Sequence, residues 1–203
     1  MVADGNLRVL GILSDASAVI AEGEVAQLLT AGDVSTTETA YFDVIRAKTA
    51  ALFRAACQIG AVVADREPDA EAALCTYGEE LGIAFQLVDD ALDYSAREAM
   101  LGKTIGDDFR EGKASLPVLL AYAAGSADER LFWERVIDAP EQQTDGDLDE
   151  AQRLLARHGT LEATFARARA AGERARTALR SFRSSPHRDA MEDIIDFSVA
   201  RAY

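Results

Sequence analysis

The sequence predicts an all-α protein, a single bundle of helices around a central cavity that covers residues 1–203. Three observations support this fold class. Apolar residues recur at steps of three and four in the long segments, which is the spacing of an amphipathic helix. Short connections with helix-capping residues separate these segments. With 203 residues, of which 49% are hydrophobic and four are proline, the chain can bury one core.

The charge balance excludes several classes of partner. A net charge of −14 argues against nucleic acid or an anionic membrane surface held by general electrostatics. The chain starts with no basic segment that leads into an apolar one, and charged residues interrupt its most apolar stretch, 47–64. Cys57 and Cys75 are too few for a disulfide framework, so they are predicted to be buried thiols in a reducing compartment. A cytoplasmic protein that is not an integral membrane protein is expected.

The first predicted helix runs from Leu7 to Ala31 and ends before Gly32. Its stripe begins with packing residues and turns polar at Glu24 and Gln27. These two residues either shape a site or form a solvent-facing helix end. The full stripe is Leu10, Leu13, Ser17, Ile20, Glu24, Gln27 and Ala31.

The second predicted helix begins at a capping box made by Ser35 and Glu38. Lys48 lies in the middle of its apolar stripe. Because a buried ammonium without a partner is costly, Lys48 either extends to solvent or pairs with an acid. The stripe is Tyr41, Ile45, Lys48, Leu52, Ala55 and Ile59.

A central helix is predicted to follow 66–68 and to end near Tyr94, with Leu74, Gly78, Leu81, Phe85, Val88 and Leu92 on its apolar stripe. Gln86, Asp89 and Asp93 lie on the neighbouring stripe. Residues four apart on a helix bring their Cβ atoms to within about 5–6 Å, so Asp89 and Asp93 can bind one ion.

Three carboxylates, Asp89, Asp90 and Asp93, lie near the C-terminal end of this helix, where the helix dipole disfavours anions. A cation should therefore offset them. Oxygen ligands without a nearby His or Cys favour Mg²⁺, which commonly shares its coordination sphere with substrate phosphates. The alternative is a solvated acidic patch.

The next segment, 102–113, contains three glycines, two lysines and an arginine, which predicts a phosphate-binding loop rather than a helix. Further helices are predicted to start at Ser115, at a Ser126 and Glu129 capping box, at Asp147 with Glu150, at Thr160 and at Ser185. Small residues in the middle of the helix that starts at Thr160 imply that another helix approaches closely.

These motifs, in this order, resemble the second aspartate-rich motif and the following loop of trans-isoprenyl diphosphate synthases, the polyprenyl synthetase family. The resemblance rests on Gly-x-x-Phe-Gln-x-x-Asp-Asp-x-x-Asp at 82–93, Gly-Lys-x-x-Gly-Asp at 102–107 and Glu-Gly-Lys-x-Ser-Leu-Pro at 111–117. It covers the whole chain and is closer to long-chain members that make quinone side chains. It implies an isoprenoid-synthase-type helical bundle.

The resemblance also implies a reaction, the head-to-tail addition of isopentenyl diphosphate to an allylic diphosphate. Asp89, Asp90 and Asp93 would then bind Mg²⁺ on the allylic diphosphate, and Asp107 would be an outer-shell acid. The substrate-binding set would be Lys48, Gln86, Lys103 and Lys113. The catalytic set would be Lys48, Thr49, Gln86 and Lys103, with Thr49 and Gln86 lining the carbocation.

The chain departs from the family in one respect. Members carry a first aspartate-rich motif and basic residues for isopentenyl diphosphate upstream of the part that this chain resembles, so the chain corresponds to the C-terminal two-thirds of a synthase with the N-terminal helices missing. Three functions stay open: a prenyltransferase, a non-catalytic subunit or fragment that binds allylic diphosphate or dimerises with a complete synthase, and, least favoured, a terpene cyclase. We expect a homodimer or association with a full-length synthase, and no measurable condensation by the 203-residue chain alone.

Overall fold

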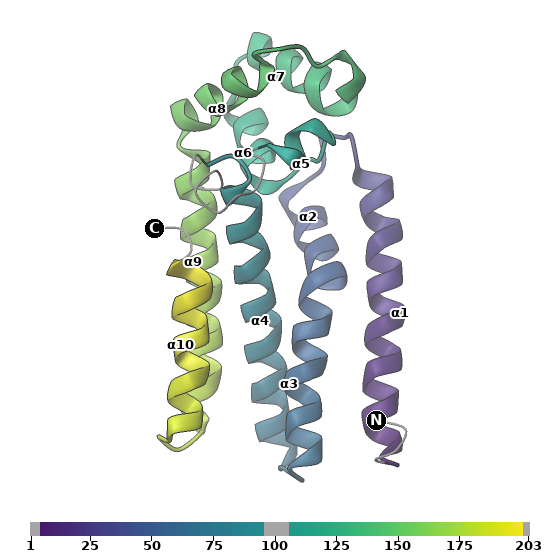
Figure 1. Ribbon diagram of the computed structural model, residues 1–203, viewed down its shortest axis with the longest axis vertical. Coiled ribbons are helices and arrows are strands. Elements are labelled where there is room, and N and C mark those ends of the chain that lie inside the picture. The colour runs from purple at the N-terminus through teal and green to yellow at the C-terminus, as the bar shows by residue number, and fades with distance from the viewer. Residues whose placement is uncertain (1–4, 96–105, 201–203) are drawn as a thin grey trace.

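The protein is described by a computed structural model at residues 5–95 and 106–200. Helices, and no strand, occur in these two ranges, which confirms the all-α fold class. Long helices lie side by side and shorter helices form a cap across one end of them (Figure 1). Nowhere in the described ranges is a helix both long and apolar enough to cross a membrane.

The long part of the bundle alternates in direction along the chain. It consists of α1 (Leu7–Thr30), α2 (Glu38–Ile45), a π-helical turn (Arg46–Ala50), α3 (Ala51–Val63), α4 (Pro68–Leu92), α9 (Thr160–Ala178) and α10 (Pro186–Ala200). The cap consists of α5 (Asp107–Arg110), α6 (Leu116–Ala124), α7 (Ala127–Trp133), a π-helical turn (Glu134–Asp138), a 3-10 turn (Pro140–Gln142) and α8 (Asp147–His158). A second 3-10 turn, Leu179–Ser181, ends α9.

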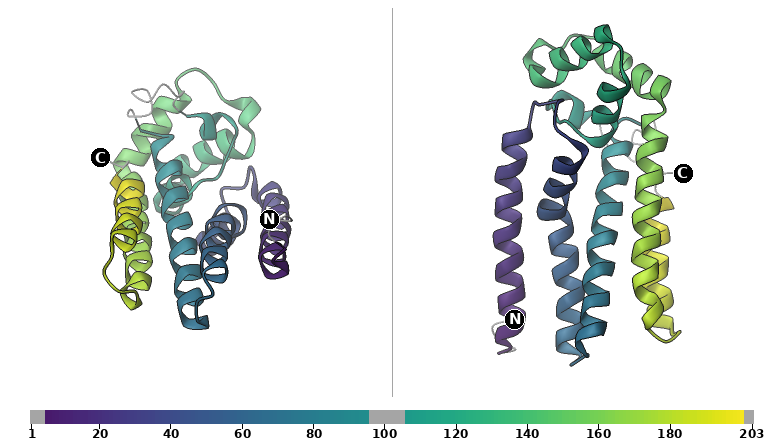
Figure 2. Two further views of the ribbon diagram at one scale, coloured as in Figure 1. Left: turned by 60° about the horizontal axis from the view of Figure 1, so that its bottom comes forward. Right: turned by 180° about the vertical axis from the view of Figure 1, so that it is seen from behind.

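Helix α4 is the centre of the bundle. Figures 1 and 2 show it between α3 on one side and α9 on the other, with α1 at the far edge beyond α3. Its second half is buried on almost all sides, from Leu81 to Leu92, because apolar or small residues occupy most of that stretch. Gly82 allows the backbone of the preceding π-helical turn to come close, since a Cβ atom there would lie 2.6 Å from Ala50 Cα.

The close helix approach predicted for α9 is confirmed. Gly172 faces α10, and a Cβ atom on it would lie 3.0 Å from Ile195 Cγ2. Ile195 belongs to an apolar cluster at this end of the bundle, which also contains Tyr77 of α4 and Leu179. Small residues on α9 therefore bring α10 into the core.

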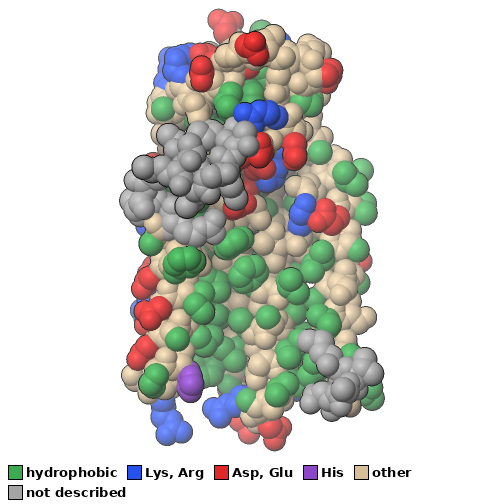
Figure 3. Space-filling model, viewed as in Figure 1, with side chains coloured by type: hydrophobic (Ala, Val, Ile, Leu, Met, Phe, Trp, Pro, Cys, Tyr) green, Lys and Arg blue, Asp and Glu red, His purple; other side chains and the backbone are tan. Residues whose placement is uncertain are grey.

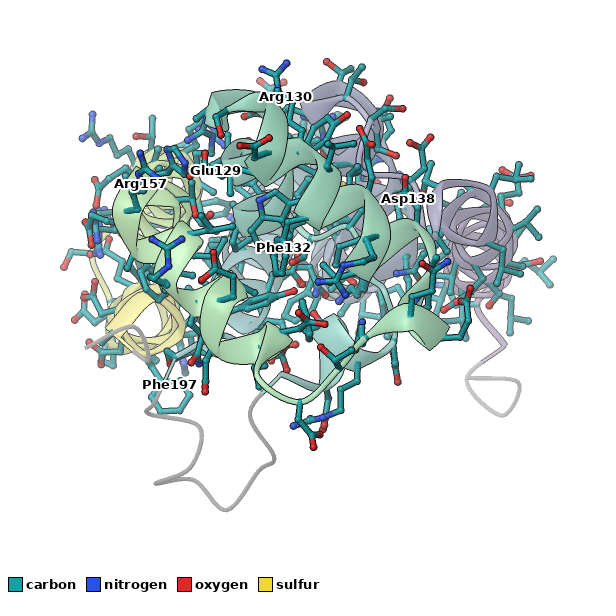
Figure 4. The ribbon with its side chains drawn as sticks, turned by 90° about the horizontal axis from the view of Figure 1, so that it is seen from above. Glu129, Arg130, Phe132, Asp138, Arg157 and Phe197 are labelled. Atoms are coloured by element: carbon teal, nitrogen blue, oxygen red, sulfur yellow. The ribbon has the colours of Figure 1, made fainter. Side chains whose placement is uncertain are left out.

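The cap has an apolar core of its own, formed by Trp133, Val136, Ile137, Leu154 and Leu155 among others. The capping box of Ser126 and Glu129 is confirmed at the start of α7. Figure 4 shows Glu129 and Arg157 close together at the outer side of the cap, where Arg157 Nη1 donates to Glu129 Oε1 at 2.7 Å. This pair joins α7 to α8.

The capping box predicted at Ser35 and Glu38 is wrong. The N-cap of α2 is Thr37, whose side chain accepts a hydrogen bond from the Ala40 backbone nitrogen at 3.2 Å. Ser35 donates its hydroxyl hydrogen to Asp33 Oδ1 at 2.6 Å instead. The hydroxyl that the pattern assigned to the helix is bound within the preceding turn, so the helix begins two residues later.

The predicted stripe of α1 is also wrong in part. The buried residues are Val9, Ala16 and Gly23, whereas Ser17 and Glu24 of the predicted stripe are exposed. Two of the three buried residues are small, so α1 packs through a narrow seam against the π-helical turn and α3. Many of the larger apolar residues of α1 remain exposed, so they do not form this contact.

The π-helical turn at Arg46–Ala50 changes the register of the helix that contains it. A π-helical turn inserts an extra residue into an α-helix and displaces the positions that follow. Leu52, which the predicted stripe placed in the core, is 52% exposed, whereas Ala50, which was not on that stripe, is buried. Ala55 of the predicted stripe is buried as expected. The turn also carries Lys48 and Thr49, two of the predicted site residues.

Candidate active site

A cavity of about 430 Å³ opens between the bundle and the cap. Its walls come from the C-terminal half of α1, from α2 and its π-helical turn, from α4 and from the segment around α5. Five predicted site residues line it: Lys48, Thr49, Gln86, Asp90 and Lys113. Figure 3 shows acidic and basic side chains together where the cap meets the long helices, above a largely apolar face.

Asp90 lies at the centre of a hydrogen-bond network and is fully buried. Tyr41 donates its phenolic hydrogen to Asp90 Oδ2 at 2.6 Å. Gln86 Nε2 and Lys113 Nζ donate to Asp90 Oδ1 at 2.7 and 3.2 Å. Thr49 in turn donates its hydroxyl hydrogen to Gln86 Oε1 at 2.9 Å. The network thus joins α2, the π-helical turn, α4 and the segment after α5.

Lys113 also donates to Asp108 Oδ2, at 2.7 Å. Burial by itself would lower the pKa of Lys113, but the two carboxylates outweigh burial and hold that pKa above its ordinary value. Burial raises the pKa of Asp108, and the ammonium of Lys113 offsets part of this shift. Lys113 is therefore a cation that offsets buried acids at the C-terminal end of α4.

Asp93 anchors the segment that follows. Its Oδ1 and Oδ2 atoms accept hydrogen bonds from the backbone nitrogens of Asp107 and Asp108, each at 3.1 Å. These nitrogens belong to the first turn of α5, a short helix where the sequence predicted only a loop. Gly106 precedes it with a φ of +80°, a value that favours glycine, and donates its backbone hydrogen to the Asp93 carbonyl oxygen at 2.8 Å. Asp93 thus holds the start of α5 against the end of α4.

Lys48 is bound by α1, so of the two alternatives for its ammonium the structure shows pairing with an acid. Its Nζ atom lies 3.1 Å from Glu24 Oε2 and donates to Gln27 Oε1. Gly23 permits this approach, because a Cβ atom there would lie 2.7 Å from the Lys48 backbone nitrogen. Gln27 lines the cavity, whereas Glu24 is exposed and contacts the site only through Lys48.

The remaining predicted residues are placed less centrally. Lys103 lies outside the described residues. Asp89 is half-buried on α4. Asp107 is exposed, and its Oδ1 atom accepts a hydrogen bond from Arg110 Nη1 at 2.9 Å. Within the two described ranges, no three His, Cys, Asp or Glu side chains are grouped so that they could hold a metal ion together. Of the predicted trio of aspartates, Asp90 and Asp93 thus have different hydrogen-bond partners.

Comparison with known proteins connects this site to a family. The model of the family described as Polyprenyl synthetase matches residues 1–155. The chain belongs to the polyprenyl synthetase family. Octaprenyl diphosphate synthases of Haemophilus influenzae and Escherichia coli are each 39% identical to it, over 98% and 99% of this chain. The resemblance drawn from the motifs is confirmed.

Solved structures of polyprenyl synthetases have the same fold. A decaprenyl diphosphate synthase from Rhodobacter capsulatus superposes with a TM-score of 0.94 and 49% identity over 100% of this chain and 62% of that one. A polyprenyl synthase from Caulobacter crescentus, solved with calcium and isoprenyl diphosphate, superposes with a TM-score of 0.94 and 46% identity. This match also covers 100% of this chain and 62% of that one. The chain spans 60% and 62% of the length of the two octaprenyl diphosphate synthases.

The motif comparison missed two members of this polyprenyl synthetase site. Tyr41 and Asp108 contact the predicted residues directly but were not in the predicted set. Tyr41 lies seven residues before Lys48 on the same predicted stripe, so the sequence contained a signal that it could lie near the site. Asp108 lies beside the predicted Asp107, and only the start of α5 decides which of the two faces inward.

Proposed function

We propose that this chain carries the diphosphate-binding half of a trans-polyprenyl diphosphate synthase, a transferase that adds isopentenyl diphosphate to an allylic diphosphate to make a long-chain product. The observation that carries the proposal is the cavity in which two lysines, Lys48 and Lys113, lie beside Thr49, Gln86 and the buried Asp90. Its relatives in the polyprenyl synthetase family include octaprenyl diphosphate synthases, which supports the long-chain class of product.

Mg²⁺ is the proposed metal, because the acidic side chains at the end of α4 offer only oxygen ligands and a hard divalent ion prefers these. Asp89, Asp90 and Asp93 form the proposed metal site. Asp89 is half-buried, whereas Asp90 and Asp93 are buried, so we expect Asp89 to be the carboxylate that is most accessible to the ion.

Each remaining residue has a proposed task in the ionisation of an allylic C–O bond. When bound, Mg²⁺ would neutralise charge on the leaving diphosphate. Lys48, Lys113 and Lys103 would bind its oxygens, which stabilises the negative charge as it develops. Thr49 and Gln86, at the wall of the cavity, would lie beside the carbon that becomes electron-poor.

We expect Mg²⁺-dependent binding of inorganic pyrophosphate, measured by isothermal titration calorimetry. Asp89→Ala should weaken this binding at least about tenfold, since one pair of opposite charges a few ångströms apart near a protein surface accounts for more than 1.4 kcal/mol. Asp149→Ala, which removes an exposed acid of α8, is the matched control and should bind as the wild type does. Equal affinity in Mg²⁺ and in EDTA would remove the metal from the proposal.

Condensation by the 203-residue chain alone stays a separate prediction. We expect no measurable incorporation of radiolabelled isopentenyl diphosphate with geranyl or farnesyl diphosphate as the allylic partner. The assay needs protein free of host synthase. Metal-dependent polyprenyl product that disappears in Asp89→Ala would show that this expectation is wrong and that the chain turns over by itself.

We also propose that the chain self-associates through α1. Val25, Leu28 and Leu29 on this helix are exposed, the last two by 76% and 80%, and a second copy that covers them would bury this apolar surface. Light scattering should show a dimer that Leu29→Glu weakens, whereas Leu131→Glu, at an exposed position of α7, should leave it intact. A monodisperse wild-type monomer would contradict the proposal.

We propose a cytoplasmic location, which cell fractionation tests.

A further inference from the structure

The chain segment from α5 to Lys113 packs against the cap as well as against α4. Phe109, the buried residue of α5, belongs to the apolar core of the cap together with Val136. Gly112 follows with a φ of +66°, and a Cβ atom on it would lie 2.6 Å from the Ile137 carbonyl oxygen. The segment therefore lies directly against the π-helical turn of the cap.

The Gln143 side chain joins this segment to that turn. Its Nε2 atom donates to the carbonyl oxygens of Phe109 and Val136, each at 2.7 Å. Because a carbonyl oxygen only accepts hydrogen bonds, the nitrogen end of the Gln143 amide must face both, and its two hydrogens supply one bond to each. A methionine here would have a similar length but no donor, so it would remove both bonds.

The Phe109 carbonyl group lies next to the groups that position Lys113. The backbone nitrogen of Lys113 donates to the Asp108 carbonyl oxygen at 2.9 Å, and its ammonium binds the Asp108 carboxylate. Asp93 holds the N-terminal end of α5 through two backbone nitrogens. Gln143 holds the other end of α5, the one from which the chain continues to Lys113.

A helix of four residues makes few hydrogen bonds of its own, so its position depends on contacts of this kind. Gln143 is half-buried in the cap and does not line the cavity. We propose that Gln143 is a positioning residue, which holds the C-terminal end of α5 so that the Lys113 ammonium lies in the cavity, where it meets the diphosphate. Because the proposal deepens the function proposed above, it rests on that function for the identity of the ligand.

The test is Mg²⁺-dependent binding of inorganic pyrophosphate, measured by isothermal titration calorimetry. Gln143→Met should weaken this binding about fivefold, since it removes two hydrogen bonds that support α5 and no contact with the ligand. Gln142→Met is the matched control, because it makes the same substitution at the preceding residue, whose side chain is exposed. This control should bind as the wild type does, and an equal loss in both variants would contradict the proposal.

Combined variants show whether Gln143 acts through Lys113. In a Lys113→Met background, Gln143→Met should cause a further loss of less than about twofold, because the ammonium that it positions is already absent. In a Lys48→Met background the fivefold loss should persist, because Lys48 is held by α1 at another wall of the cavity. A purely structural role would weaken binding equally in both backgrounds, and this result would overturn the proposal.

A second measurement separates this inference from the proposed function. Amide hydrogen exchange of the free protein, followed by NMR, reports on the end of α5 without a ligand. Gln143→Met should speed the exchange of the Gly112 and Lys113 amides at least about fivefold, whereas Gln142→Met should not. If the wild type binds no pyrophosphate, the proposed function fails and these exchange rates decide whether Gln143 holds α5. Exchange that Gln143→Met leaves unchanged would overturn the inference even if pyrophosphate binds.

Discussion

Gly82→Ala is expected to lower the free energy of unfolding by about 2–3 kcal/mol, because it overpacks a contact between two helix backbones. The added Cβ atom would lie 2.6 Å from Ala50 Cα and 3.0 Å from Ala50 Cβ. Neither atom belongs to a flexible side chain, so α4 and the π-helical turn must move apart. The same displacement should lengthen the hydrogen bond from Thr49 to Gln86, now 2.9 Å, and weaken pyrophosphate binding.

Urea unfolding followed by circular dichroism measures the effect, and Gly60→Ala is the control. Gly60 also lies in this helix pair, on α3, but a Cβ atom there would meet nothing within 4 Å. Alanine is favoured over glycine within a helix, so this variant should gain up to about 1 kcal/mol. If the two variants shift the midpoint in the same direction, the close approach at Gly82 does not limit the packing.

Lys113→Met is expected to cost about 3 kcal/mol of stability, at the lower end of the range for removing one partner of a buried ion pair. The substitution leaves Asp90, which is fully buried, and Asp108 without their shared ammonium. The Lys113 side chain is itself 26% exposed, and partial solvation of this kind reduces the loss. Pyrophosphate binding should weaken as well.

Two further variants separate charge loss from the loss of a buried partner. Lys48→Met removes a lysine from the same cavity, but its partner Glu24 is exposed, so this variant should weaken pyrophosphate binding with a stability change below about 1 kcal/mol. The double variant Lys113→Met with Asp90→Asn should recover part of the lost stability, because the fully buried Asp90 position then carries no charge and only Asp108 has lost its ammonium. A single Lys113→Met variant as stable as the wild type would show that water reaches Asp90.

The amino-acid pattern was sufficient for the fold class and for most helix bounds. Apolar residues at helical spacing, proline at the start of α4 and glycine after α8 are local signals. Such signals are nearly sufficient to predict where a helix begins and ends. The capping box at Ser126 is equally local and was predicted correctly. The one at Ser35 failed because the neighbouring Asp33 binds the same hydroxyl, and competition of this kind is not visible in a four-residue motif.

Part of the predicted set of site residues lies together in the structure, although Asp89 and Asp93 do not line the cavity. Lys48, Thr49, Gln86, Asp90 and Lys113 come from three separate segments, and all line one cavity. The motif resemblance selected them because residue type and order are visible in a sequence. The partners that orient them were not predictable in this way, since Tyr41 and Asp108 take their roles from contacts across helices.

The sequence by itself determined that the chain is a helical bundle with acids, lysines and a glycine-rich segment around a cavity, because these properties follow from residue type and local spacing. Only the tertiary structure decided that Asp90 is fully buried between Tyr41, Gln86 and Lys113, and that Asp93 binds the start of α5. Burial and hydrogen-bond partners depend on which helices meet. Three similar carboxylates on one helix can therefore have three different surroundings.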